Sequence, residues 1–193
     1  MTIRFATEAD APALLAIYAQ YIDTAVTFEY DKPTLADFTA RVREISREWP
    51  YLVCEENGRI LGYAYAHRAR ERAAYNWFVE LSVYLDPACT RRGLGKTLYR
   101  LLLDILRLQG VKTAMGCVTM PNPASEALHA SLGFHLAGRS VNAGYKNGAW
   151  HDVAWYELPL GSYDIPPVPV KPIGALDREA LAALLEKYSH AGN

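Results

Sequence analysis

The amino-acid sequence predicts an α/β fold of the α+β type, in which a mixed, mostly antiparallel central sheet is flanked by helices. Three observations predict it. The chain has 193 residues, of which 51% are hydrophobic, so one domain with a full core is the expected outcome. Segments rich in aromatic and β-branched residues are interleaved with segments of helical periodicity. Asn-Gly pairs at 57–58 and 147–148 supply the positive φ angles of tight hairpin turns.

The chain begins with a strand and two helices. Residues 3–5 alternate between apolar and polar as a short strand does, and Thr7 followed by Asp10 predicts the cap of a helix with apolar positions up to residue 22. A second helix follows Thr34, because apolar residues recur there at helical spacing, and Trp49-Pro50 ends it.

The remaining elements are mostly strands. The segment MPNP at 120–123 interrupts the regular secondary structure, and Gly133 is expected at the C-terminal end of a helix. A basic loop at 68–75 precedes a strand rich in aromatic and branched residues. In order, we predict hairpin strands at 51–55 and 60–67, a strand at 77–85, a helix at about 95–109, a strand at 113–119, a helix at 125–132 and hairpin strands at 134–145 and 150–160.

The chain divides into a domain at 1–162 and an extension at 163–193. The extension starts with "YDIPPVPVKP", which predicts a polyproline-like strap, because proline cannot donate the hydrogen bonds of a sheet. Asp177 then caps a helix whose apolar stripe is Leu181, Leu184, Leu185 and Tyr188. That stripe is too small to fold alone, so it docks either on the core or on a partner subunit.

Composition argues against several classes of partner. Twenty basic and 21 acidic residues give a net charge of -1, which provides no general attraction for nucleic acid or an anionic membrane. Cys54, Cys89 and Cys117 are odd in number and widely spaced, which predicts core thiols in a reducing compartment rather than disulfides or a metal site. We find no apolar run long enough for a signal core or a membrane span, so we expect the cytoplasm.

The segment "PACTRRGLGKTLYR" at 87–100 places basic residues and glycines directly before a helix. It is not a Walker A loop, because Thr90 stands where the first glycine belongs, and it is not GxGxxG, because Leu98 stands at the third. A glycine turn at a helix N-terminus can still bind an anion such as a pyrophosphate. An ordinary strand-to-helix turn with solvated arginines is equally compatible with these residues.

The surrounding motifs decide between these alternatives. The succession "ELSVYLDP", "RRGLGKTLYRLLL", "AMGCVT" and "PNPASEALHASLGF" resembles the acetyl-CoA-binding half of the GNAT superfamily of acetyltransferases. "RERAAYNWFVELSVYL" and "GYKNGAWHDVAWYELPL" narrow the resemblance, which spans residues 4–172, to the phosphinothricin and methionine sulfoximine acetyltransferases. It implies the GNAT fold, acetyl-CoA as cosubstrate and a homodimer. One departure is Thr90, where the family usually has Gln or Arg, and we expect it to weaken cofactor binding modestly.

The resemblance also assigns cofactor contacts. The main chain of Val83 and Leu85 would bind the pantetheine arm as an added strand, and Asn122 and Ser131 would reach other parts of CoA. The pyrophosphate would be held by Arg91, Arg92, Gly93, Leu94, Gly95 and Lys96.

Chemistry requires a base, because an amine must be neutral to attack a thioester. Glu80 is a lone acid inside an apolar strand, and a partly desolvated carboxylate suits that role. The alternative is a structural carboxylate paired with an Arg or Tyr. The resemblance favours Glu80 as base and His129 as a second catalytic candidate, whereas a lone helical histidine is more often a packed or surface residue. Tyr99 or Tyr145 would protonate the leaving thiolate, and the Val83 N–H would stabilise the oxyanion.

The acceptor site is predicted from the basic loop. Arg70 and Arg72 suit the anionic ends of a compact amino acid, and Phe28 and Tyr75 would wall its side chain. Composition alone favours a solvated basic loop, and it is the resemblance, which matches Arg72 and Tyr75 to substrate-binding residues of the family, that indicates an acceptor site. The expected acceptor is the α-amino group of phosphinothricin, methionine sulfoximine or methionine sulfone. The alternatives are an acetyltransferase for protein N-termini or polyamines, and a non-catalytic acyl-CoA sensor.

Overall fold

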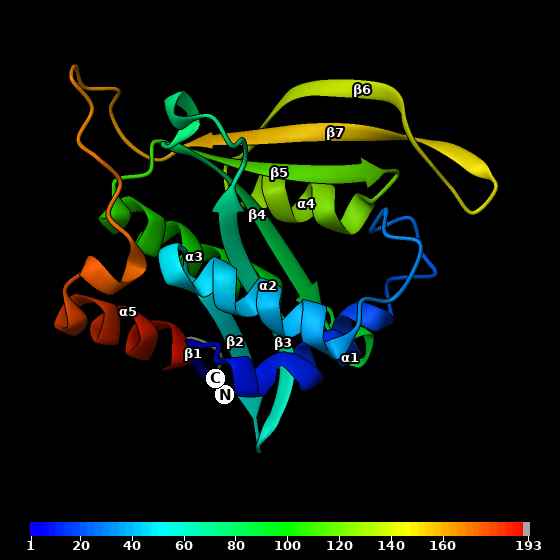
Figure 1. The fold of residues 1–193 in the computed structure, drawn as a ribbon, viewed down its shortest axis with the longest axis horizontal. Coiled ribbons are helices and arrows are strands. Elements are labelled where there is room, and N and C mark those ends of the chain that lie inside the picture. Colours follow the sequence, from blue (N-terminus) through cyan, green and yellow to red (C-terminus); the bar gives the residue numbers. More distant parts are fainter. Residues whose placement is uncertain (191–193) are drawn as a thin grey trace.

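The computed structural model describes residues 1–190 and contains one seven-stranded sheet with helices on both faces (Figure 1). Its strands are β1 (Thr2–Phe5), β2 (Tyr51–Glu56), β3 (Arg59–Arg68), β4 (Phe78–Leu85), β5 (Thr113–Met120), β6 (His135–Lys146) and β7 (Ala149–Pro159). Its α-helices are α1 (Ala11–Ala19), α2 (Leu35–Glu48), α3 (Leu94–Gln109), α4 (Pro123–Ser131) and α5 (Arg178–His190). Short 3-10 turns stand at Glu8–Asp10, Ala73–Tyr75, Pro87–Cys89 and Ile173–Ala175.

The sheet has the order β1-β2-β3-β4-β5-β7-β6. Only β4 and β5 are parallel, and every other neighbouring pair is antiparallel. The predicted mixed, mostly antiparallel sheet is therefore confirmed, including both hairpins at the Asn-Gly turns. Asn57, Gly58, Asn147 and Gly148 all have positive φ, as the type of turn requires.

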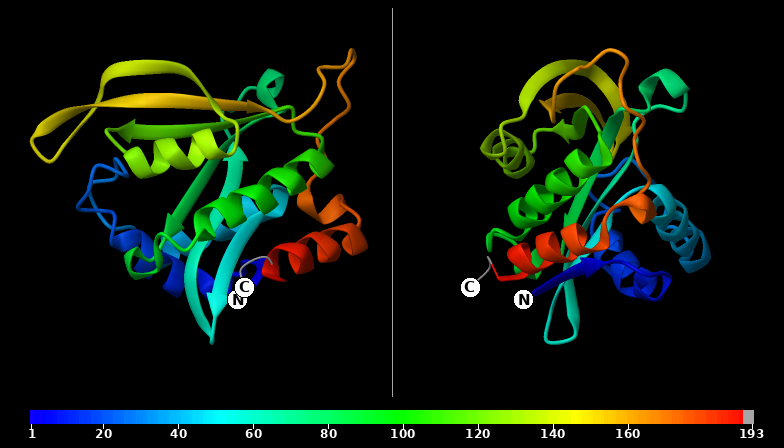
Figure 2. Two further views of the ribbon diagram at one scale, coloured as in Figure 1. Left: turned by 180° about the vertical axis from the view of Figure 1, so that it is seen from behind. Right: turned by 90° about the vertical axis from the view of Figure 1, so that its left-hand side faces the viewer.

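The helices divide between the two faces of the sheet. Side chains of α1 and α2 form one core cluster with Tyr51, Val53 and Tyr63, while α3 and α5 form another with Leu52 and Ala64. This separation follows from the two-residue period of β2 and β3, which sends alternate side chains to opposite faces. The right-hand view of Figure 2 shows α3 and α4 on one side of the sheet and α2 on the other.

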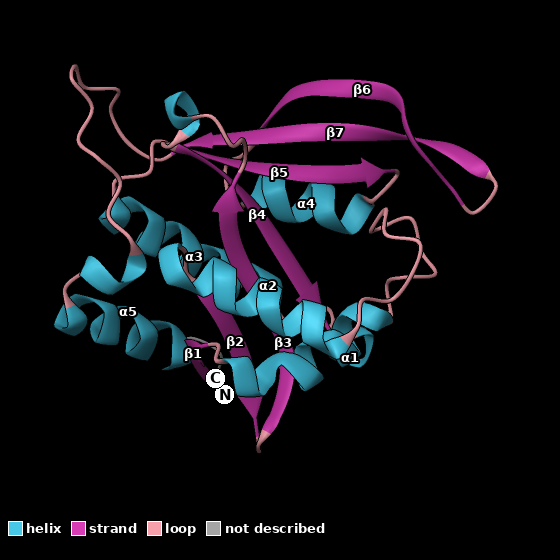
Figure 3. Ribbon diagram, viewed as in Figure 1, coloured by secondary structure: helices cyan, strands magenta, loops and turns pink. Residues whose placement is uncertain are grey.

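One element is shorter than predicted, and one strand pairs irregularly with its neighbour. The first helix ends at Ala19 rather than near residue 22, because the chain continues there in tighter turns such as Tyr21 N to Tyr18 O (2.9 Å). Strand β6 has register shifts at Leu136/Gly138 and Ser140/Gly144, so its pairing with β7 is interrupted twice. Figure 3 shows this hairpin as the longest pair of strands in the molecule.

The C-terminal extension folds back onto the same chain. Helix α5 lies against α3 and β1, with Leu181 in the core cluster, and Ser189 Oγ accepts a hydrogen bond from Ile3 N (2.9 Å). The strap is tied by its main chain, since Gln109 Nε2 donates to Lys171 O (2.8 Å). The division at residue 162 stays a prediction. Within the described chain, none of the helices has the length and apolar character to cross a bilayer.

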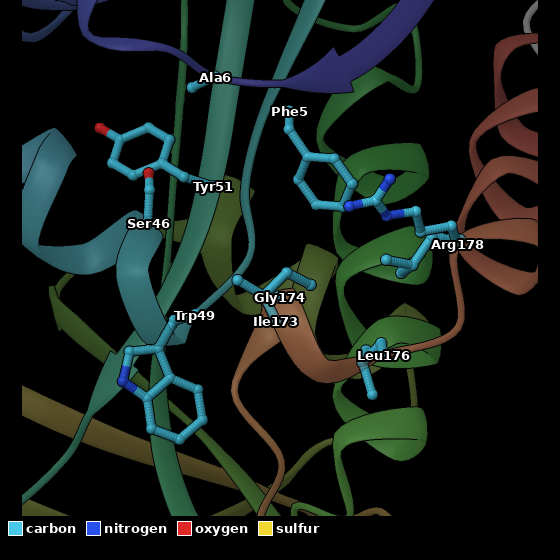
Figure 4. A pocket seen from close by; sticks show the side chains of 10 residues that line it. Phe5, Ala6, Ser46, Trp49, Tyr51, Ile173, Gly174, Leu176 and Arg178 are labelled. Atoms are coloured by element: carbon cyan, nitrogen blue, oxygen red, sulfur yellow. The ribbon is translucent and has the colours of Figure 1, made fainter.

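A cavity of about 310 Å³ lies between the extension and the body (Figure 4). Phe5, Trp49 and Tyr51 line it from the body, and Ile173 and Arg178 line it from the extension. None of the residues predicted for catalysis or binding contributes to its wall, so the active site has to be found elsewhere.

Candidate active site

The most informative feature of the sheet is the point where β4 and β5 part. Their parallel register runs from Phe78–Thr113 to Leu81–Gly116, yet β4 continues to Leu85 and β5 to Met120. In Figure 1 the two strands diverge toward their C-terminal ends. The structure thus opens a gap beside residues 82–85 in an otherwise continuous sheet.

Main-chain groups of β4 face this gap in alternation. Asp86 N donates to Leu61 O (2.8 Å) on the β3 side, and β3 and β4 are antiparallel, so even-numbered residues of β4 direct their N–H and C=O toward β3. Val83 and Leu85 therefore direct theirs toward the gap. One of these groups already has a partner, because Tyr21 Oη donates to Leu85 O (2.6 Å).

Helix α3 begins next to the gap. Gly93, its N-cap, has φ of 77°, and Arg91 has φ of 62°, so the loop uses left-handed conformations at two positions. The first α-helical bond is Thr97 N to Gly93 O (3.0 Å), so the N–H groups of residues 94–96 lie before it and point outward from the helix end. A Cβ on Gly95 would lie 3.6 Å from Leu85 Cδ1, which places this helix end against β4.

The side chains of residues 91–96 differ in their exposure and in their partners. Arg91 is exposed and Lys96 half-buried, while Leu94 is buried in the core and offers only its main chain. Arg92 pairs with Glu56 (3.0 Å), which turns its guanidinium toward the β2–β3 hairpin. Any anion held here would meet mainly backbone N–H groups.

A cavity of about 220 Å³ occupies the gap between β4 and β5. It brings together residues that the sequence prediction named separately: Phe28, Glu80, Val83, Tyr99, Asn122 and His129. Asn122 also caps α4, since its Oδ1 accepts from Ser125 N (3.1 Å). Ser131 lies at the other end of α4, exposed, and donates to Leu128 O (2.9 Å), so it is not part of this wall.

Glu80 is half-buried on β4, paired in register with His67 of β3. In the part of the chain that the structure describes, its carboxylate takes part in neither an ion pair nor a side-chain hydrogen bond. The alternative of a structural carboxylate paired with an Arg or Tyr therefore has no support in the geometry. Burial raises the pKa of the nearby Tyr99 above its usual range, and Tyr65 and Glu80 raise it further.

His129 is held rigidly with one nitrogen free. Its Nδ1 lies 2.8 Å from Ser125 O, and because a carbonyl can only accept, Nδ1 carries the proton and Nε2 the lone pair. Nε2 is buried with no hydrogen-bond partner among the described residues. Burial lowers the pKa of His129, against the opposing effect of the Ser125 bond, so the neutral imidazole is favoured.

The two tyrosines left open as acids occupy different places. Tyr99 is fully buried on α3, lines the cavity and packs edge-on to His129 with ring centroids 5.7 Å apart. Tyr145 is exposed near the end of β6, where its ring packs on Trp150. The structure brings only Tyr99 to Glu80 and His129.

The cavity also contains a residue that the sequence prediction placed wrongly. Cys54 and Cys89 are buried as expected, but Cys117 is exposed on β5 and lines the cavity. Gly116 beside it was missed as well. A glycine inside a strand is the available signal for such a close approach.

The predicted acceptor residues are only partly assembled. Phe28 lines the cavity, and Arg70 lies over the ring of Trp155 (5.9 Å), the β7 residue paired with Cys117. Arg72 is exposed and precedes the turn at 73–75. Tyr75 is exposed and lines a different cavity of about 610 Å³, so it and Phe28 do not wall one site here.

Comparison with known proteins identifies the class to which this fold and site belong. Residues 3–155 match the acetyltransferase (GNAT) domain family, so the chain belongs to the GNAT family and is an N-acetyltransferase. It is 39% identical to a phosphinothricin N-acetyltransferase of Streptomyces viridochromogenes, with 89% of this chain and 93% of the relative covered.

Two further relatives agree. An L-methionine sulfoximine/L-methionine sulfone acetyltransferase of Salmonella typhimurium is 34% identical, with coverage of 86% and 98%. The crystal structure of a phosphinothricin acetyltransferase from Sinorhizobium meliloti, in complex with acetyl-CoA, superposes with a TM-score of 0.82 at 33% identity and covers 92% of this chain and 96% of its own.

Proposed function

We propose that this chain transfers an acetyl group from acetyl-CoA to the α-amino group of a small amino acid analogue such as phosphinothricin, methionine sulfoximine or methionine sulfone. One observation carries the proposal: the Glu80 carboxylate lies without an ionic partner among the described residues, in a cavity at the divergence of β4 and β5. The names of the relatives support the donor and the acceptor class.

The residues around the gap fit acetyl-CoA. Main-chain groups of Val83 and Leu85 face the place that an added strand would take, although Tyr21 Oη would have to share or release Leu85 O. The N–H groups at the start of α3 suit a pyrophosphate, with Arg91 and Lys96 as the nearby cations. Arg92 would need to leave Glu56 to join them, and Ser131 is assigned to CoA by resemblance alone.

Acetyl-CoA supplies a thioester whose carbonyl carbon an amine can attack. In this proposal Glu80 removes the proton of the acceptor ammonium, directly or through water, so that the nitrogen lone pair becomes available. The Val83 N–H donates to the carbonyl oxygen as negative charge develops there. As the C–S bond breaks, Tyr99 protonates the sulfur, and the attacking nitrogen loses its second proton to water, which leaves a neutral amide and free CoA thiol. His129 lies beside Tyr99 as the second catalytic candidate.

Acceptor size and charge follow from the cavity. A volume of about 220 Å³ with Phe28 on its wall suits a compact side chain. Arg70 lies over Trp155, which pairs with the cavity residue Cys117, and its guanidinium suits a carboxylate. Polyamines are disfavoured, because they would require acidic groups in place of Arg70 and Arg72. A non-catalytic sensor is disfavoured by the presence of Glu80.

The experiment is a thiol-release assay with acetyl-CoA and a panel of acceptors: phosphinothricin, methionine sulfoximine, methionine sulfone, dipeptides and polyamines. We expect release with the amino acid analogues. Release only with dipeptides or polyamines, or no binding of coenzyme A in calorimetry, would overturn the proposal.

We also propose a cytoplasmic homodimer. The edge strand β6 and its neighbour β7 carry exposed large apolar side chains at Leu136, Val141 and Trp150, with exposed fractions of 58%, 69% and 63%. A surface of this kind supports association with a second copy. The three free cysteines support a reducing compartment.

A further inference from the structure

Lys146 is a buried lysine that the proposed chemistry does not use. It stands at the end of β6, directly before the Asn147-Gly148 turn, and only 2% of it is exposed. Its Nζ donates to Thr27 O (2.6 Å) and to Glu29 O (2.8 Å) in the loop that joins α1 to α2. Figure 1 shows this loop, in blue, rising toward the β6–β7 hairpin.

The two carbonyl groups that Lys146 binds flank Phe28. Phe28 lines the cavity that contains Glu80, and Thr27 lines it too. The bond to Thr27 O fixes the peptide that precedes Phe28, and the bond to Glu29 O fixes the peptide between Glu29 and Tyr30. The backbone around Phe28 is therefore held on both sides, which limits the directions in which its ring can point. Lys146 thereby connects the far end of the hairpin to the wall of the acceptor site.

Neighbouring contacts tie the same loop to the same hairpin. Asn147 Nδ2 donates to Asp23 O (2.9 Å), and Tyr30 Oη donates to the carbonyl of Tyr145. We refer to residues 23–30 as the Phe28 loop. It is therefore attached to the turn region at both of its ends as well as at its centre.

The hairpin is also shaped to receive the Phe28 ring. Gly144 has no side chain, and a Cβ there would overlap the edge of that ring. His151, opposite Gly144 on β7, has its ring centroid 6.3 Å from that of Phe28. The ring is thus held against bare backbone on one side of the hairpin.

Core packing alone does not account for a lysine here. Burying an ammonium without a carboxylate at bonding distance is costly unless its hydrogen bonds are made, and a methionine of similar length would fill the space more cheaply. A lysine does what methionine cannot, since one atom donates to two carbonyls at once. The presence of a lysine at position 146 is therefore explained by its two hydrogen bonds to the Phe28 loop.

We propose that Lys146 is a positioning residue that, by holding the carbonyl groups of Thr27 and Glu29 on either side of Phe28, determines which acceptor side chains the site accepts. This inference rests on the proposed function. Lys146 does not touch the reacting atoms, so its effect is confined to the acceptor and leaves acetyl-CoA unaffected.

The test compares Lys146→Met with Lys32→Met, a matched change at an exposed lysine near the same loop. We expect Lys146→Met to raise the KM for methionine sulfone about tenfold and to leave the KM for acetyl-CoA within twofold of the parent. The preference for short over long acceptor side chains should weaken. Lys32→Met should match the parent. An equal rise in both KM values would overturn the inference.

A double-mutant cycle with Phe28→Ala separates positioning from general damage. If Lys146 acts through Phe28, Lys146→Met should add little to the acceptor KM once Phe28 is gone; full additivity would overturn the inference. Should Lys146→Met fail to fold, Asn147→Gly keeps the positive φ of the turn, releases the loop at Asp23 and must shift the acceptor KM alone. An inactive parent enzyme would instead count against the proposed function.

Discussion

The imidazole of His129 occupies the space that a side chain on Gly116 would need. A Cβ at Gly116 would overlap Nε2, so the ring lies directly on the β5 backbone. Stacking on Tyr156 (5.2 Å) and edge contacts with Phe134 (5.0 Å) close the remaining sides. The His129 ring can therefore occupy this position only because residue 116 has no Cβ methyl group.

Gly116→Ala should displace this ring. We expect kcat to fall about tenfold or more, because His129 lines the cavity and a Cβ at Gly116 forces its ring to move, and the free energy of unfolding to fall by about 1–3 kcal/mol from overpacking. Steady-state kinetics and urea unfolding measure the two effects. Gly138→Ala is the control, since its Cβ would meet nothing within 4 Å. Parent-like kinetics in Gly116→Ala would remove His129 from the reaction.

Glu80→Gln tests the proposed base. The amide has nearly the shape of the carboxylate but cannot take a proton, so we expect kcat to fall by about 10²–10⁴ while the Kd for acetyl-CoA is unchanged. Calorimetry and the thiol-release assay measure these quantities. Glu44→Gln, an exposed change on α2, serves as control. Full turnover in Glu80→Gln across pH 6 to 9 would be incompatible with our mechanism.

The pair of Arg4 and Asp10 predicts a dependence of stability on acid pH. Arg4 donates to both carboxylate oxygens (2.8 Å each), and Thr7 N donates to one of them (2.7 Å). The bond from Arg4, opposed by burial, lowers the pKa of Asp10 to about 2. Because the folded pKa lies below the unfolded one, the stabilisation is complete above about pH 4 and is lost as the pH falls toward 2.

Asp10→Asn should therefore lower the free energy of unfolding at pH 7 by about 2 kcal/mol, and the difference from the parent should shrink toward pH 2. Urea unfolding at a series of pH values measures it. Asp31→Asn, on an exposed loop, should show no such difference. A deficit in Asp10→Asn that stayed constant down to pH 2 would contradict the assigned cause.

Much of the fold was predictable because it rests on local signals. The Asn-Gly turns, the start of α2 after Thr34 and the helical spacing within α2 each depend on a few adjacent residues, and the structure has those elements at nearly the predicted positions. The candidates Glu80, Tyr99 and His129 were also found from sequence, and the structure gathers them around one cavity although 49 positions separate Glu80 from His129.

The sequence by itself therefore determined the secondary-structure elements, the family resemblance and the candidate base Glu80 on β4. Only the tertiary structure decided that β5 leaves β4 after Leu81, that Cys117 faces the resulting cavity, and that Lys146 holds the loop of Phe28. The physical reason is distance along the chain. Capping and periodicity act within one or two turns, whereas the contact of Lys146 with Thr27 joins residues 119 positions apart, and no local pattern encodes it.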